Sequence, residues 1–409
     1  MTLERATTLL VAIGAIATLL GGGAAIWGYL NAPQAFFPAW LAGFYFWLSM
    51  PAGALGLLLI WDLTGGRWGP LARLPLTAMA ATIPLFLLLY LPIVAGMPTL
   101  YPWMRAPVAA KLHNGWYLNR EFFFIRAGFY FLVWIGFAAW QLLRRPGPDG
   151  GSPKGYQWLS GIGVLLMGYS LTYAGIDWLM STEPDWFSSI YGMVVGSGQF
   201  IAAISCALVL LVIGARSGAT TSPAPEHVAA HAHARAASGH PAARAAGFSG
   251  PAAVLAQEDL FKPGLASLAA VLVAVIVFWA YTSFCQWLII WEENLHSEIH
   301  WFIERWARPW GDVIYVLAGA HFLVPFLALV WSPTKRNPTL VGAVCGLLLL
   351  ADLLQVWWLV LPGFQKGGFS WLDPAVMVCV GGLWLLALAG ALTVLRDRIP
   401  PAPPEAGYA

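Results

Sequence analysis

Two ionisable residues, His321 and Asp352, fall inside long apolar stretches of the sequence. An ionisable side chain within a membrane-spanning helix is costly unless it is paired or hydrated, so such residues often belong to ion or proton pathways. A rise of 1.5 Å per residue from the ends of their segments places both about 13–14 Å below the same membrane surface. Gln199 falls at this depth in another segment, and Gln355 lies one turn from Asp352. The spacing favours a proton relay or a site for a quinone head group. The structural alternative is an internal hydrogen bond that only holds helices together.

A second polar group lies closer to that membrane surface. Arg126 is about one turn inside its apolar segment, and Asp177 is about one turn inside the end of the next one. Antiparallel neighbours would bring the two to similar depth, so we expect an ion pair between them. It is either a structural salt bridge or part of a proton entry assisted by Glu183. Asp62, near the opposite surface, is either the matching proton exit or the first solvated residue after a helix, as the glycine pair that follows it indicates.

The stretch 292–311 combines acidic residues with tryptophans. It reads either as an amphipathic segment that lies on the membrane surface or as a docking face for a partner protein. In the second interpretation, Glu292 and Glu293 face a basic partner surface and Trp301 anchors in a desolvated patch.

The histidines and cysteines argue against a redox cofactor bound to this chain. Only His321, of eight histidines, sits within an apolar segment, whereas a bis-histidine haem needs two at matching depth. The four cysteines lie in apolar runs without CxxC or CxxCH spacing, which argues against zinc, covalent haem or an iron–sulfur cluster. The other four histidines of interest, at 227, 231, 233 and 240, lie in a stretch of low sequence complexity. Such a stretch favours a solvated linker, and metal binding by these histidines is the alternative. The sequence thus predicts no metal site and no catalytic residue.

The elements that must position these residues are membrane helices. Hydrophobic residues make up 59% of the 409 residues and charged residues 10%, well below the ~25% charged residues of a soluble protein. An ordinary soluble enzyme is therefore excluded. Segments of about 20 apolar residues can each cross the bilayer, and they predict an all-α membrane protein with ten transmembrane helices at 7–30, 38–61, 76–95, 122–143, 159–180, 190–213, 264–291, 312–331, 339–361 and 372–395.

The loops divide by charge. Most of the 21 basic residues lie in the set of loops that includes both termini, which predicts that both termini are cytoplasmic. Composition divides the chain into a first part at 1–213, a flexible Ala/His/Pro-rich cytoplasmic linker at 214–263, a second helical part at 264–395 and a disordered tail at 396–409.

Four blocks of sequence resemble a known family. The chain is similar to the NrfD-like integral membrane subunits, the polysulfide-reductase type, and most of all to the F-type subunits of alternative complex III. The resemblance covers nearly all ten segments and rests on FYFWLSMPAGALGLLLIWDLTGGRWG (44–69), YLNREFFFIRAGFYFLVW (117–134), DWLMSTEPDWFSSIYG (177–192) and FWAYTSFCQWLIIWEENLHSEIHWFIER (278–305).

The resemblance implies two four-helix bundles, the first at 38–180, with two peripheral helices. It also implies a place in the bacterial cytoplasmic membrane within a quinol:cytochrome c, or other high-potential acceptor, oxidoreductase. The partners would be a paralogous NrfD-like subunit, an iron–sulfur subunit, c-type cytochromes and small membrane anchors. Those partners would carry the haem c and the clusters. The F-type subunit is credited with a proton pathway and scaffolding, and quinol is a possible ligand. Asp177 matches the family's buried acid, whereas Asp62 stands where we expect a histidine.

Other functions compete with this expectation. In an NrfD-type anchor, this chain would itself bind quinol and form part of the enzyme site. A secondary transporter usually shows internal repeats and broken helices, and no convincing repeat is visible in this sequence. A purely structural scaffold would tolerate replacement of its mid-membrane polar residues. Whether the chain takes a direct part in an enzymatic reaction is left open by the sequence.

Overall fold

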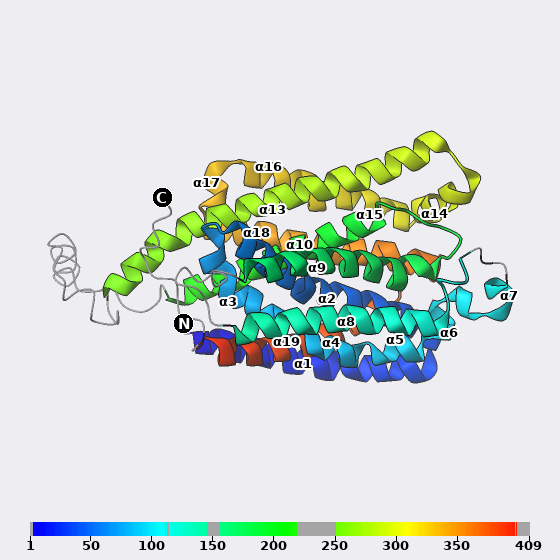
Figure 1. The fold of residues 1–409 in the computed structure, drawn as a ribbon, viewed down its shortest axis with the longest axis horizontal. Helices are drawn as coiled ribbons and strands as arrows, with labels where there is room; N and C mark the ends of the chain where they lie inside the picture. The colour runs from blue at the N-terminus through cyan, green and yellow to red at the C-terminus, as the bar shows by residue number, and fades with distance from the viewer. Residues whose placement is uncertain are drawn as a thin grey trace.

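The computed structural model of the chain describes residues 3–110, 112, 114–144, 156–218, 251–396 and 398. In this part, the chain forms ten helical segments that are long and apolar enough to cross a membrane. They run roughly parallel along one axis, and both α1 and α19 have their terminal ends at the same end of the molecule (Figure 1). The prediction of an all-α membrane protein with ten spanning helices is confirmed.

Among the first six spans, the fifth ends in a short 3₁₀ turn, and the third is divided further. That span is a chain of three shorter helices interrupted at proline-containing junctions, because a proline cannot donate a backbone hydrogen bond to the preceding turn. The helices of this half are α1 (Leu3–Asn31), α2 (Pro33–Thr64), α3 (Trp68–Ala80), α4 (Ile83–Leu89), α5 (Leu91–Ala95), α6 (Met97–Leu100), η1 (Pro102–Met104), α7 (Ala106–Ala109), α8 (Arg120–Leu143), α9 (Gln157–Trp178), η2 (Met180–Thr182) and α10 (Tyr191–Gly218).

The second half supplies the last four spans and one short amphipathic helix. Its eighth span contains a π-helical turn, η3, between two α-helical parts. The helices are α13 (Pro251–Glu293), α14 (His296–Trp306), α15 (Trp310–Leu317), η3 (Ala318–Leu323), α16 (Val324–Val330), α17 (Ser332–Lys335), α18 (Pro338–Val360), η4 (Leu361–Gly363) and α19 (Leu372–Leu395).

The spans pack as two bundles with an outer pair. The first bundle contains α2, the α3–α5 chain, α8 and α9, and the second contains α10, α13, α15–α16 and α18. The two bundles meet where α2 packs against α10. A side chain at Gly53 of α2 would collide with the carbonyl of Gln199 in α10, so glycine permits this close approach. Helices α1 and α19 pack on each other, and α19 also packs on α2.

Several predicted boundaries differ from the structure, and the third span, for example, begins at Trp68 rather than at residue 76. The second span begins at Pro33 rather than at residue 38, since a proline is tolerated in the first helical turn. The predicted linker is too long, because α10 continues to Gly218 and α13 already begins at Pro251. Alanine is the best helix former, so the Ala-rich stretch before Pro263 was misread as linker. Residues 219–250 of the linker, with its four histidines, lie outside the described residues, as does the tail apart from 396 and 398.

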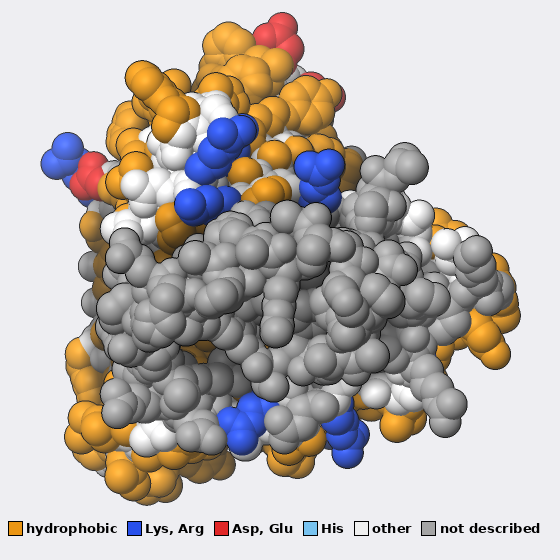
Figure 2. All heavy atoms as spheres, turned by 90° about the vertical axis from the view of Figure 1, so that its left-hand side faces the viewer, with side chains coloured by type: hydrophobic (Ala, Val, Ile, Leu, Met, Phe, Trp, Pro, Cys, Tyr) orange, Lys and Arg blue, Asp and Glu red, His pale blue; other side chains and the backbone are white. Residues whose placement is uncertain are grey.

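Basic side chains gather at the end of the molecule where the terminal helices α1 and α19 have their outer ends. Figure 2 looks onto this terminal face, and several Lys and Arg side chains are visible around its rim. The terminal face is the one predicted to be cytoplasmic, and this orientation stays a prediction.

Candidate functional site

The mid-membrane residues of the second bundle come together. Nε2 of His321 in η3 lies 3.9 Å from Oδ1 of Asp352 in α18. His321 has none of its surface exposed and Asp352 only 2%. The equal depth predicted from counting residues therefore corresponds to direct proximity. The distance is too long for a hydrogen bond and short enough for one water molecule or a small side-chain shift to connect the two groups.

The helix that carries His321 is irregular at this point. Residues Ala318–Leu323 form a π-helical turn, which holds an extra residue per turn and often occurs at functional sites. Pro325 follows four residues after His321 and cannot donate a backbone hydrogen bond to the carbonyl of His321. The regular helical ladder is therefore weakened beside the imidazole. This local sequence explains why the turn departs from an ordinary α-helix.

Several buried polar atoms around Asp352 have no hydrogen-bond partner within the described part of the chain. They are both ring nitrogens of His321, Oδ2 of Asp352, Oε1 of Gln355 and Oε1 of Gln199. We call these four residues the central polar cluster. Buried polar atoms are nearly always satisfied in folded proteins, and unsatisfied ones call for a functional or solvent-based explanation. The arrangement can accept, hold and pass on protons.

Two neighbouring helices shape the space around the central polar cluster. A Cβ atom at Gly198 in α10 would lie 3.0 Å from Oδ1 of Asp352 and 3.5 Å from Oε1 of Gln355, so the glycine leaves room for both side chains. The indole of Trp279 in α13 packs edge-on against the imidazole of His321, with ring centres 4.2 Å apart. The next α10 residue, Gln199, donates from Nε2 to the hydroxyl of Tyr45 in α2 at 2.9 Å. The cluster thus reaches the seam between the bundles.

The predicted ion pair between Arg126 and Asp177 is confirmed. Nε and Nη2 of Arg126 donate to the two carboxylate oxygens of Asp177 at 2.8 and 2.9 Å, and the hydroxyl of Tyr130 donates to the same carboxylate at 2.6 Å. Nη1 of Arg126 donates to the carbonyl of Tyr117, and its guanidinium stacks over that ring. Burial and the negative charge of Asp177 raise the pKa of the Tyr117 hydroxyl, which keeps it neutral. Every group of this pair is satisfied, which favours the structural interpretation.

Asp62 is buried, so its interpretation as a solvated residue after a helix is wrong. Its carboxylate accepts from Nη2 of Arg144 at 2.6 Å, from Nε2 of Gln141 at 2.8 Å and from the hydroxyl of Ser160 at 3.1 Å. Arg144 follows α8 directly, and Arg126 lies near the other end of α8. Eighteen residues separate the two arginines, so α8 is held by an arginine–aspartate pair at each end, about 27 Å apart.

Glu183 pairs with an arginine other than Arg126, and its role of assisting a proton entry stays a prediction. Its carboxylate accepts from Nη2 of Arg305 in α14 at 2.6 Å. Arg305 is fully buried and also donates to the carbonyls of Trp358 and Leu359 at the end of α18. The indoles of Trp186 and Trp301 stack beside it, 4.2 Å apart and 10° from parallel. We call Glu183, Trp186, Trp301 and Arg305 the loop latch.

The loop latch also corrects the predicted docking surface. Trp301 is only 3% exposed, so it is an internal packing residue and not an anchor for a partner. Glu292 and Glu293 are exposed at the end of α13, and their docking role stays a prediction.

Several members of these sites were not predicted from the sequence, among them Arg144, Arg305 and Tyr45. Arg144 and Arg305 both come after apolar segments, where loops are expected, and Tyr45 carries no charge. The spacing of Gln141 and Arg144, three residues apart at a helix end, and of Trp301 and Arg305, four apart, places each pair on one helical face. This spacing could have identified these residues from the sequence.

The fold and the buried ion pairs define a multi-pass α-helical membrane protein. Among the described residues, no three His, Cys, Asp or Glu side chains are grouped so that they could hold a metal ion. No protein-family model matches the sequence, and no curated protein matches it significantly.

Proposed function

We propose that this chain is an integral membrane subunit of a quinol-oxidising complex of the alternative complex III type, and that it conducts protons through the central polar cluster. The observation that carries the proposal is the buried His321–Asp352 pair, 3.9 Å apart, in a π-helical setting with unsatisfied polar atoms around it. The type of complex rests on the resemblance of the four sequence blocks.

The energetics distinguish this cluster from an ordinary helix–helix contact. A structural polar pair in a membrane is expected to satisfy its own groups, as Arg126 and Asp177 do. Within the described part of the chain, the ring nitrogens of His321 and Oδ2 of Asp352 have no such bonds, and an unsatisfied buried polar group costs about 1–3 kcal/mol. The unsatisfied groups of this cluster therefore do not stabilise the fold. Proton exchange between a carboxyl and an imidazole gives the arrangement a use.

One route from the cluster leads along α18 toward the loop latch. Gln355 lies one turn from Asp352, and Leu359, whose carbonyl binds Arg305, lies one turn further. These two turns cover about 10 Å. The side chain of Glu183, 15% exposed, connects this end to the surface. In the proposal, protons pass between Asp352 and the surface beside Glu183.

The redox chemistry belongs to partner subunits in this proposal. Haem c groups and iron–sulfur clusters are held by c-type cytochromes and an iron–sulfur subunit, next to a paralogous NrfD-like subunit and small membrane anchors. This chain supplies the membrane path and scaffold. Glu292 and Glu293 are exposed at the surface opposite the terminal face and suit a basic partner surface.

A second candidate function is a quinol-binding anchor. The unpartnered donors and acceptors of His321, Asp352 and Gln355 suit a quinol head group. The enclosure of the cluster argues for the proton role, because His321 and Asp352 are at most 2% exposed and a head group would need an opening toward the lipid.

The proposal is tested with Asp352→Asn, which keeps the size of the side chain and removes its titrating proton. We expect the variant to assemble with its partners while proton release per electron, or coupled turnover, falls. The matched control is Asp373→Asn, because Asp373 is equally buried but accepts hydrogen bonds from Gln365 and the backbone of Ser370. An intact Asp352→Asn complex with normal proton stoichiometry would remove the relay and leave the scaffold interpretation.

A further inference from the structure

Span eight, which carries His321, is the least buried helix of the two bundles. Only 28% of its most apolar window of residues is buried, the smallest share among the eight spans that form the bundles. Tyr315, Leu323 and Leu327 on its outer side are each more than half exposed. In a bilayer these side chains face hydrocarbon, which is as apolar as the protein surface it replaces. A small rotation of this helix therefore costs little packing energy.

The π-helical turn η3 gives such a rotation a place to occur. The backbone N–H of Val324 donates to the carbonyl of Gly319, five residues before it. An α-helix would use the carbonyl four residues before, so η3 contains one surplus residue. A turn of this kind can pass its surplus residue to the adjoining turn. The shift moves the residues that it passes by about 1.5 Å along the helix and turns them by about 100° around it.

Small side chains and a proline leave the turn free to make this shift. Ala318, Gly319 and Ala320 lead into His321, and a Cβ atom added at Gly319 would meet no other atom of the described chain within 4 Å. On the other side, Pro325 cannot donate to the carbonyl of His321. The regular hydrogen-bond ladder therefore does not lock the turn in one place.

His321 lies at the position that the shift would turn. The turn η3 packs on α13 and on α18. The imidazole contacts the indole of Trp279 on α13, with ring centres 4.2 Å apart, and its Nε2 lies 3.9 Å from Oδ1 of Asp352 on α18. Neither ring nitrogen has a hydrogen-bond partner within the described residues. In this part of the chain, packing alone holds the imidazole, and no hydrogen bond of the ring has to break when the helix turns.

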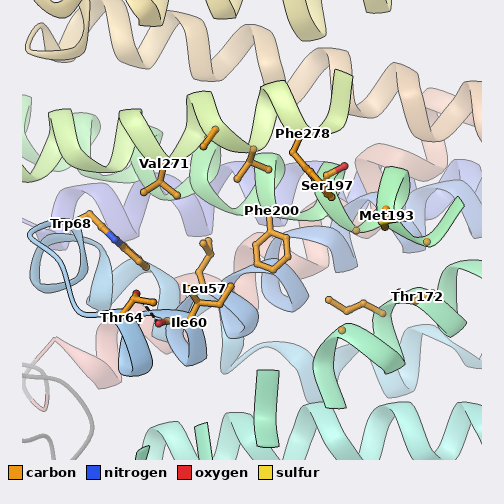
Figure 3. A pocket seen from close by; sticks show the side chains of 16 residues that line it. Leu57, Ile60, Thr64, Trp68, Thr172, Met193, Ser197, Phe200, Val271 and Phe278 are labelled. Atoms are coloured by element: carbon orange, nitrogen blue, oxygen red, sulfur yellow. Dashed lines mark hydrogen bonds between the residues drawn. The ribbon is translucent and has the colours of Figure 1, made fainter. Parts of the chain in front are cut away.

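The apolar groove between the bundles does not open onto this imidazole. The groove has a volume of about 500 Å³ and is lined by residues of α2, α3, α9, α10 and α13, among them Phe200 and Phe278 (Figure 3). In the described chain, neither η3 nor α18 contributes to its lining. His321 and Asp352 are at most 2% exposed. An imidazole that moves inside the protein gives the enclosed carboxyl of Asp352 a proton partner without an opening toward lipid.

We propose that η3 is a two-position joint. The shift of its π turn by one residue turns the imidazole of His321 toward Asp352 or away from it, so proton exchange with the carboxyl occurs in one position only. The 3.9 Å distance belongs to the position in which the imidazole faces Asp352. The inference rests on the proposed proton relay and adds the moving part of that relay.

The motion is tested on the full-length protein in lipid nanodiscs with isotope-labelled histidine. The magnetic resonance signals of His321 are those missing from His321→Gln, and we expect two sets of ring signals in the parent. Deletion of Gly319 removes the surplus residue and should leave one set. Gly319→Ala keeps the chain length and should retain both. A single set in the parent, or two sets in the deletion variant, would overturn the joint.

A second variant tests the same joint without a change of length. Pro325→Ala supplies an N–H to the carbonyl of His321 and favours the regular helix, so it should shift the population toward one of the two sets. Pro263→Ala replaces another proline inside a helix, in α13, and is the matched control. Equal populations in Pro325→Ala and in the parent would count against the joint.

The use of the joint in proton transfer is measured in the assembled complex. Proton release per electron should fall as far in the Gly319 deletion as in Asp352→Asn, and Gly319→Ala should match the parent. Pro325→Ala is measured in the same way if the deletion variant does not assemble. Normal release in these joint variants, together with a fall in Asp352→Asn, would overturn the joint and leave the relay standing. Normal release in Asp352→Asn would overturn the relay and, with it, the role of the joint.

Discussion

The guanidinium of Arg305 is fully buried and lies 2.6 Å from the carboxylate of Glu183, although the two residues are 122 positions apart. This contact joins the connection between α9 and α10 to the amphipathic helix α14. The same guanidinium binds carbonyls at the end of α18, the helix that carries Asp352. The loop latch therefore ties both bundles together at the end opposite the terminal face and closes that end above the central polar cluster.

Arg305→Gln should destabilise the protein strongly. It removes the charge that neutralises Glu183 and the donors to two α18 carbonyls, and loss of one partner of a buried pair costs about 3–5 kcal/mol. Thermal unfolding in detergent measures the effect. Lys366→Gln, which breaks the exposed pair with Glu304, serves as the control and should leave the midpoint nearly unchanged. An Arg305→Gln protein as stable as the parent would show that the latch does not hold the bundles.

Asp177→Asn should reduce stability and leave proton transfer intact. The Arg126–Asp177 pair is fully satisfied by its own hydrogen bonds, and its loss leaves Arg126 buried without a counter-charge, at a cost of about 3–5 kcal/mol. Combining Asp177→Leu with Arg126→Leu should cost less than the sum of the two single changes. Proton release per electron is then measured in the assembled Asp177→Asn complex. A fall as large as in Asp352→Asn would place the pair in the proton path.

Gly198→Ala should impair proton transfer without touching a titratable group. The added methyl group would lie 3.0 Å from Oδ1 of Asp352 and push the carboxyl from its position beside His321. Gly196→Ala, on the same helix, meets no atom within 4 Å and is the matched control. Coupled turnover of the assembled complex is the readout. Equal turnover in the two variants would mean that the position of the carboxyl does not matter.

Reversal of Glu292 and Glu293 to Lys should weaken assembly with redox partners. Both side chains are exposed at the end of α13, and two like charges against a basic surface would slow association and loosen the contact. Co-purification of haem-bearing subunits measures assembly. The control is Glu121→Lys, an exposed acid at the start of α8. Normal recovery of all partners would exclude this surface from docking.

The orientation prediction is tested with reporters. A fusion after Ala409 should behave as cytoplasmic and an insertion near Ser297 as periplasmic, because basic residues concentrate in loops of the terminal face. The opposite result at either site would reverse the direction assigned to every depth in the membrane.

The sequence by itself determined the ten spans and the common depth of His321 and Asp352. Both follow from local properties, the hydrophobicity of about 20 consecutive residues and a rise of 1.5 Å per residue. The pair of Arg126 and Asp177 could also be predicted, because the two residues lie near the same membrane surface on consecutive helices.

Only the tertiary structure decided which buried groups are partners. Asp62 had two possible interpretations until the structure placed Arg144 and Gln141 beside it, and the structure pairs Glu183 with Arg305 of a distant helix. The sequence favoured Trp301 as a surface anchor, whereas in the structure Trp301 stacks on Trp186. Each outcome depends on how helices rotate and neighbour one another. Those choices are set by close contacts such as Gly53 against Gln199, and apolar sequence, which suits lipid and protein surroundings alike, does not reveal them.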